Sequence, residues 1–159
     1  MHAHRRTTLA LLACLLAPAC VSARVTRDSS ANGPSVPSAD PVYAASRPGA
    51  VFSPAVRAGG LLFLSGKLGT DSTGKLVAGG VRAETRQALA NIQAELERNG
   101  SAMDRVVKCT VLLADIAEWG AMNEAYGPFF PTSKPARTAV AVKGIPLDAR
   151  VEIECVAAA

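Results

Sequence analysis

In the stretch KPARTAVAVKGIPLDARVEIECV, residues 134–156, side chains of two kinds alternate along 137–143 and again along 151–155. Successive side chains of a strand point to opposite faces, so this period of two predicts two strands. We expect them to form a hairpin whose turn is centred near Pro146. That geometry would place Glu152 roughly opposite Ala141 and several residues away from Arg137.

Two charged side chains in this apolar hairpin need an explanation, because a buried charge without a partner costs several kcal/mol. An internal ion pair between Arg137 and Glu152 is one reading, although their offset along the hairpin argues against a direct cross-strand pair. A functional site is the other. The guanidinium fork binds a carboxylate through two N–H groups, and a nearby glutamate can orient or deprotonate water. These two groups suffice for chemistry on a small carboxylate-bearing substrate without a metal or a cofactor.

The first 19 residues have the layout of a bacterial secretory signal. A basic segment at 2–6 precedes an apolar run at 9–16 and the small residues Ala17-Pro18-Ala19. The apolar run is too short for a bilayer core, which needs about 20 residues. Cys20 follows directly and resembles the modified cysteine of a lipobox, although Ala17 stands where leucine is usual. Two outcomes stay open: a lipid-anchored protein that begins at Cys20, or a freely secreted one. Both predict a periplasmic or secreted protein.

Residues 20–47 are rich in Ser, Pro and Ala and have no sustained periodicity, which predicts a disordered tether. The domain itself is expected at 48–159. After Arg47 there are twelve Lys and Arg residues against eleven Asp and Glu, so this domain is close to neutral. The sequence pI of about 9.1 therefore owes much to the N-terminal segment. No nucleic-acid partner is predicted from this charge balance.

The domain reads as strand, strand, helix, strand, helix, strand, strand. Ala58-Gly59-Gly60 marks a first hairpin, and apolar residues at helical spacing predict a helix over 81–98 that ends at Asn99-Gly100. A strand is expected within 105–114. Asp115 and Glu118 resemble a capping box that opens a second helix carrying Trp119, Met122, Tyr126 and Phe129. This order predicts an α+β fold with both helices on one face of a mixed sheet.

Histidine and cysteine positions limit the chemistry. The only histidines, His2 and His4, lie in the predicted signal, so the mature protein would lack an imidazole for Ser-His or Cys-His catalysis or for a zinc site. Cys109 and Cys155 lie within apolar strands, where a cysteine commonly serves as a small hydrophobic residue. Export would permit a disulfide between them. Without the strand order, both readings of this pair stay open.

Five segments of the domain resemble the Rid family, also called the YjgF family, of enamine and imine deaminases. They are LFLSGKLG, DRVVKCTVLLAD, MNEAYGPFFP, KPARTAVAV and ARVEIECVA. The resemblance implies a chorismate-mutase-like α+β fold that assembles as a homotrimer with clefts between subunits. It implies hydrolysis of 2-imino acids to 2-oxo acids and ammonia, with Arg137 binding the substrate carboxylate and Glu152 positioning water. The remaining pocket residues that it implies are Phe52, Ser65, Gly66, Asn123 and Ala139.

Two hypotheses of different class follow from this resemblance. Family members commonly carry tyrosine and cysteine at the positions of Phe52 and Ala139. An exported imine deaminase is favoured by the presence of both Arg137 and Glu152, since binding alone needs only the arginine. A non-catalytic periplasmic protein that binds small carboxylates is favoured by the loss of the tyrosine hydroxyl.

Overall fold

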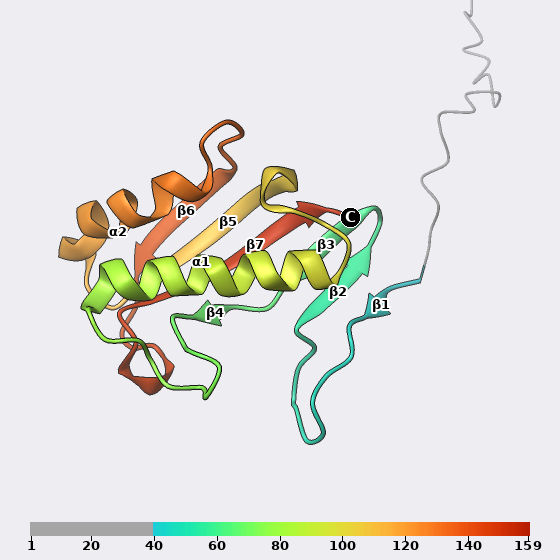
Figure 1. The fold of residues 1–159 in the computed structure, drawn as a ribbon, viewed down its shortest axis with the longest axis horizontal. Helices are drawn as coiled ribbons and strands as arrows, with labels where there is room; N and C mark the ends of the chain where they lie inside the picture. Colours follow the sequence, from blue (N-terminus) through green and yellow to red (C-terminus); the bar gives the residue numbers. More distant parts are fainter. Residues whose placement is uncertain (1–39) are drawn as a thin grey trace, which may run out of the picture. The chain divides into compact units, whose positions relative to one another are not determined.

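A computed structural model describes residues 40–159, where two helices cover one face of a seven-stranded sheet (Figure 1). The predicted signal peptide, Cys20 and the tether up to residue 39 lie outside the described residues. The strands are β1 (Val42–Tyr43), β2 (Ala55–Ala58), β3 (Leu61–Leu64), β4 (Lys67–Leu68), β5 (Val106–Leu113), β6 (Ala136–Ala141) and β7 (Val151–Ala158). The helices are α1 (Gly80–Arg98) and α2 (Trp119–Tyr126), and short 3-10 turns span Met103–Arg105, Ile116–Glu118, Gly127–Phe129 and Pro146–Asp148. The predicted α+β class is confirmed.

The predicted hairpin of the 134–156 stretch is wrong. The strand order is β1-β2-β3-β7-β5-β6, so β5 lies between β6 and β7. β5 runs parallel to β6 and antiparallel to β7. Glu152 therefore pairs with Leu112 of β5 rather than with Ala141.

The connection between β6 and β7 passes around the end of β5. Val142 N–H donates to the Leu113 carbonyl at 2.9 Å, and Ala114 N–H donates to the Arg150 carbonyl at 3.0 Å. From Cys109 to Leu113, every second residue of β5 is buried, on the face that the helices cover. A strand buried in this way is most stable with a partner strand along each edge. The two strands flank β5 because its backbone has two edges to satisfy.

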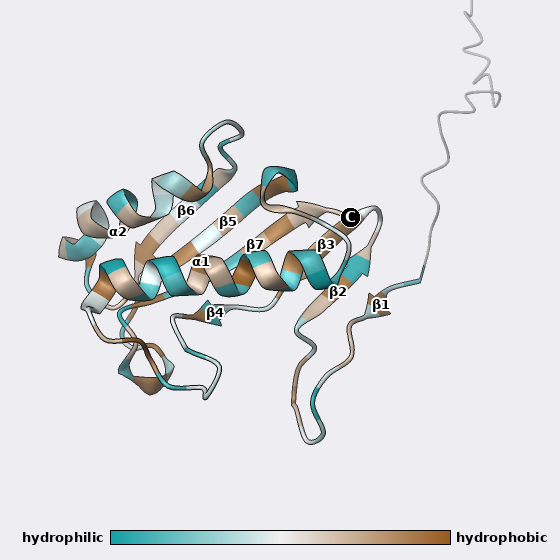
Figure 2. Ribbon diagram, in the orientation of Figure 1, coloured by the Kyte–Doolittle hydropathy of each residue, from teal (hydrophilic) through white to brown (hydrophobic). Residues whose placement is uncertain are grey.

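The core lies between the sheet and the helices. Figure 2 shows α1 with hydrophilic and hydrophobic residues alternating along its length, as the predicted amphipathic pattern requires. The buried residues of this layer include Ala88, Leu89, Ile92, Leu96, Val111, Leu113, Met122, Val151 and Ile153. Cys109 of β5 and Cys155 of β7 are direct strand partners and are joined by a disulfide. Of the two readings that the sequence left open for this pair, the disulfide is the one found.

The ends of the two helices follow the predictions only in part. Gly100, with a φ of +74°, ends α1 as expected, because a left-handed residue there costs glycine little. The predicted capping box is half correct. Asp115 accepts a hydrogen bond from Ala117 N–H at 2.9 Å, but Glu118 pairs with Arg150 instead of reaching back.

The ordered domain begins earlier than predicted. Val42 and Tyr43 pair with Arg57 and Val56 as an added edge strand, although the tether was expected to continue to residue 47. Composition could not reveal this, because a two-residue edge strand is stabilised by backbone pairing and leaves its side chains exposed. Within residues 40–159, no helix has the length and apolar character that crossing a membrane requires.

Candidate active site

Arg137 lies on the helix-facing side of β6. Its backbone pairs with Cys109, whose side chain is fully buried beneath the helices. The guanidinium carbon lies 4.7 Å from the ring centre of Tyr126 and 5.9 Å from that of Trp119, both on α2. One guanidinium nitrogen also lies 4.0 Å from the Met122 sulfur. The charge is thus held against aromatic faces.

No carboxylate of the described residues pairs with Arg137. The ion pairs within residues 40–159 are Lys67–Glu95, Arg98–Glu95, Arg82–Glu124 and Arg150–Glu118. The planar fork of Arg137 is therefore available to an anion, and a carboxylate fits it through two parallel N–H donors. The internal ion pair that the sequence left open is absent from this part of the chain.

Glu152 lies on the opposite, helix-free side of the sheet. Its strand partners are Leu112 of β5 and Leu68 of β4. Its side chain is half-buried, and burial, together with the negative charge of Glu154, raises the pKa of the Glu152 carboxyl. A carboxyl with a raised pKa accepts a proton more readily near neutral pH, which suits a group that activates water.

Gly66 is in contact with the Glu152 carboxylate. A Cβ atom added at Gly66 would collide with Oε1 of Glu152, so the absence of a side chain there leaves room for the carboxylate. The neighbouring Ser65 is engaged, since its hydroxyl donates to the Ser53 carbonyl at 2.7 Å. The structure therefore brings together Glu152, Gly66 and Ser65 but leaves Arg137 apart from them.

Arg137 and Glu152 cannot form one site within a single chain. Arg137 is in register with Cys109 and Glu152 with Leu112. Cys109 and Leu112 are three positions apart on one strand, and an odd separation places their side chains on opposite faces of the sheet. Ala139 shares the Arg137 face, because two positions separate them on β6.

Asn123 and Tyr126 of α2 each carry a buried polar atom. Asn123 Oδ1 and the Tyr126 hydroxyl are buried and have no hydrogen-bond partner among the described residues. Burial raises the pKa of Tyr126 to about 12, against the opposing effect of the Arg137 charge. The phenol is thus neutral at physiological pH and retains its donor. Buried polar atoms of this kind usually find a partner in water, a ligand or another chain.

A cavity of about 1120 Å³ lies at a different place. It opens between the segment 44–54 and α1, and it is lined by Phe52 and Gly66 but by neither Arg137 nor Glu152. Phe52 is 64% exposed there.

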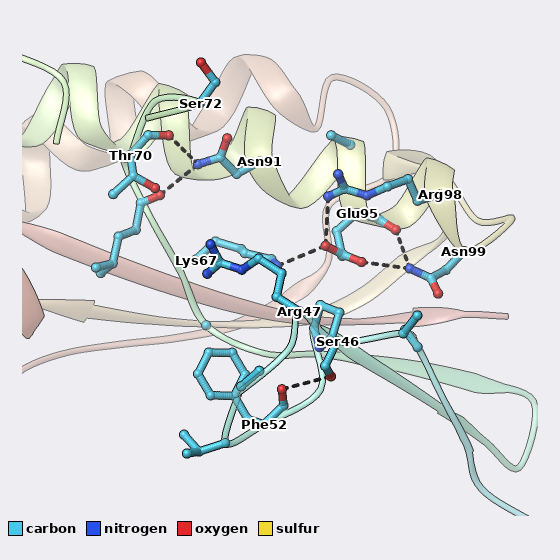
Figure 3. A pocket seen from close by; sticks show the side chains of 18 of the residues that line it. Ser46, Arg47, Phe52, Lys67, Thr70, Ser72, Asn91, Glu95, Arg98 and Asn99 are labelled. Carbon is cyan, nitrogen blue, oxygen red and sulfur yellow. Dashed lines mark hydrogen bonds and ion pairs between the residues drawn. The ribbon is translucent and has the colours of Figure 1, made fainter. Parts of the chain in front are cut away.

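An ionic network around the buried Glu95 occupies one wall of this cavity. Figure 3 shows Lys67 and Arg98 converging on Glu95, with Nζ–Oε2 and guanidinium–Oε2 distances of 3.1 and 2.8 Å. Burial alone would raise the pKa of Glu95, but the hydrogen bond and charge of Lys67, with the charge of Arg98, lower it overall. Both cations are engaged with the Glu95 carboxylate, whose single negative charge offsets one of their two positive charges.

Sequence reasoning missed the roles of Trp119 and Tyr126 beside Arg137. The sequence placed both residues on the second helix without a role; in the structure Tyr126 is buried, whereas Trp119 is 46% exposed. Exposure is a property of the fold, so no local sequence pattern marked Trp119. The strand order was also needed, because it brings β6 beneath α2.

Comparison with known proteins places the chain in a family. The protein-family model described as endoribonuclease L-PSP matches residues 43–159. The human 2-iminobutanoate/2-iminopropanoate deaminase is 43% identical over 73% of this chain and 87% of its own. A Rid family protein of Yersinia pestis gives a TM-score of 0.68 at 35% identity, covering 74% of this chain and 94% of its own. The YjgF gene product of E. coli gives a TM-score of 0.66 at 32% identity, covering 73% and 93%. The chain therefore belongs to the endoribonuclease L-PSP family, which is the Rid or YjgF family.

Proposed function

We propose that the protein is an imine deaminase that hydrolyses 2-imino acids to 2-oxo acids and ammonia. The observation that carries this proposal is the half-buried guanidinium of Arg137, which has no carboxylate partner among the described residues. The name of the human relative supports the same reaction. The family description names an endoribonuclease, but the near-neutral domain and the lack of histidine after His4 do not favour RNA cleavage.

The proposed reaction is a hydrolysis at the C=N carbon. Arg137 binds the substrate carboxylate through its fork and fixes the C=N bond beside it. Glu152 orients a water molecule and accepts one of its protons as the oxygen bonds to that carbon. Glu152 passes that proton to the nitrogen. As the hydroxyl oxygen forms the C=O bond, the C–N bond breaks, and the nitrogen takes the hydroxyl proton and leaves as ammonia. Neither step calls on a metal or a cofactor.

This mechanism implies a site shared between chains. Because Arg137 and Glu152 lie on opposite faces of the sheet, a site that uses both must draw them from two protomers. A closed ring of identical chains would repeat such a site at every boundary. The number of chains, three, comes from the family resemblance.

Export is the second part of the proposal. It is supported by the order of basic, apolar and small residues before Cys20 and by the Cys109–Cys155 disulfide, because disulfides persist in oxidising compartments. Mass spectrometry of the protein from its native host should find a mature start at or near Cys20. A diacylglyceryl mass on Cys20 would identify a lipoprotein, and a soluble product with intact Met1 would contradict export.

The activity is tested by coupling the purified full chain to an amino-acid oxidase that releases 2-iminopropanoate from alanine. The protein should accelerate ammonia release and reduce the amount of imine that semicarbazide traps. An Arg137→Ala variant is the matched control and should behave like the uncatalysed reaction. If the wild type binds pyruvate without accelerating ammonia release, the chain is instead a non-catalytic carboxylate-binding protein.

A further inference from the structure

Two aromatic rings of α2 lie against the guanidinium of Arg137, which has no carboxylate partner among residues 40–159. Tyr126 is buried, and its ring centre lies 4.7 Å from the guanidinium carbon. Trp119 is on the solvent side and lies 5.9 Å away. Both distances fall within about 6 Å, the range over which a cation is attracted to a ring face. We refer to Trp119 and Tyr126 as the aromatic clamp.

An aromatic clamp suits an arginine that must bind an anion and release it again. A carboxylate partner would also stabilise the charge, but it would occupy the N–H groups that a ligand needs. Ring faces replace part of the lost hydration and leave those donors unoccupied. They also limit the directions in which the planar group can turn, which reduces the ordering cost of ligand binding.

We propose that the aromatic clamp positions Arg137 for carboxylate binding and that Trp119 is the residue that sets its orientation on the solvent side. This inference rests on the proposed function, which assigns Arg137 to the substrate carboxylate. Core packing accounts for Tyr126 but not for Trp119, because nearly half of the Trp119 surface remains exposed. Tyr126 contacts Arg137 through its ring. Its hydroxyl has no hydrogen-bond partner among the described residues.

The first test separates positioning from structure. Trp119→Leu should raise KM for the 2-imino acid about tenfold, equal to ~1.4 kcal/mol, and leave kcat within about twofold. Trp119→Phe keeps a ring and should restore most of the wild-type KM. Ile116→Ser, a change at a 56% exposed apolar residue one turn earlier, is the matched control and should leave KM unchanged. An unchanged KM in Trp119→Leu, or equal losses in the Leu and Phe variants, would overturn the proposal.

The second test does not depend on catalysis. Trp119 is the only tryptophan of the chain, so the tryptophan emission of the full protein reports directly on this position. Pyruvate, which carries the carboxylate of the expected product, should change the emission in a saturable manner in the wild type and not in Arg137→Ala. Calorimetry should give a pyruvate Kd about tenfold weaker in Trp119→Leu than in Trp119→Phe.

These measurements distinguish two kinds of failure. A wild type that binds pyruvate through the aromatic clamp but releases no ammonia refutes the deaminase function and retains the positioning role. A wild type that is active, with Trp119→Leu binding pyruvate as tightly, refutes the positioning role and retains the function. A wild type that does not bind pyruvate removes the carboxylate site and refutes this inference with it.

Discussion

At the scale of single residues, two half-buried charges are stabilised in different ways. Arg137 is held against aromatic faces, whereas Glu152 lies beside a glycine and a second carboxylate, Glu154. Neither arrangement neutralises the charge within the described residues. Both groups therefore remain reactive toward a ligand, and this sets different expectations for the two substitutions that remove them.

Substitutions of the two charged residues should separate binding from turnover. Arg137→Lys replaces the fork by a point charge, so KM should rise by roughly ten- to a hundredfold. Glu152→Gln keeps the shape but cannot accept a proton, so kcat should fall by about 10²- to 10⁴-fold with pyruvate binding retained. Arg86→Lys, an exposed change on α1, serves as the control. Wild-type activity in Arg137→Ala would remove both the site and its assigned function.

The pH dependence of activity should report on Glu152. Burial first, and then the charge of Glu154, raises the pKa of its carboxyl. Water activation needs the ionised form, so activity is present above this pKa and is lost as the pH falls through it. Glu154→Gln removes one raising cause and should shift the acid limb of the kcat/KM profile to lower pH. Asp104→Asn, exposed and distant in sequence, should leave the limb in place, and an upward shift in Glu154→Gln would contradict the assignment.

At the scale of secondary-structure elements, local signals and strand order behave differently. Periodicity predicted the strands within 134–156, the helix over 81–98 and the stop at Gly100, because each depends on neighbours in sequence. The order β7-β5-β6 depends on which edges of β5 remain unpaired, and no local pattern records that. The assignment of Arg137 and Glu152 as site residues came from their chemistry and the family resemblance. Their placement on opposite faces required the register.

The Cys109–Cys155 disulfide should contribute measurably to stability. It joins the neighbouring interior strands β5 and β7 across a sequence separation of 46 residues, and a cross-link of this length typically stabilises by about 2–4 kcal/mol. A double Cys109→Ala, Cys155→Ala variant should therefore unfold at a temperature lower by several degrees in calorimetry. Reductant should lower the wild-type transition toward that of the variant and leave the variant unchanged. If reductant left the unfolding temperature of the wild type unchanged, the disulfide would be absent or would not contribute to stability.

At the scale of the whole molecule, the helix-free face of the sheet indicates a partner. Val56, Phe63 and Val156 lie side by side across β2, β3 and β7, and Phe63 is 45% exposed. Apolar surface gathered on a sheet face commonly marks an interaction site. A homotrimer would cover this face and complete each site at the same time.

Light scattering on the purified protein should give about three times the mass of one chain. Phe63→Asp introduces a charge into the expected interface and should shift the protein toward monomers with loss of activity. Leu147→Asp, at a 61% exposed apolar residue of a 3-10 turn, tests the effect of the charge itself and should leave the assembly intact. A stable monomer with full activity would contradict the shared site.

The placement of Arg137 and Glu152 on opposite faces of the sheet can be tested by mixing two variants. If each site takes one residue from each of two neighbours, two inactive proteins can complement each other. Equal amounts of Arg137→Ala and Glu152→Gln chains, unfolded and reassembled together, should regain activity in about one quarter of their sites. Either variant reassembled alone should stay inactive. A mixture as inactive as its components would show that both residues act within one protomer or that one of them does not act at all.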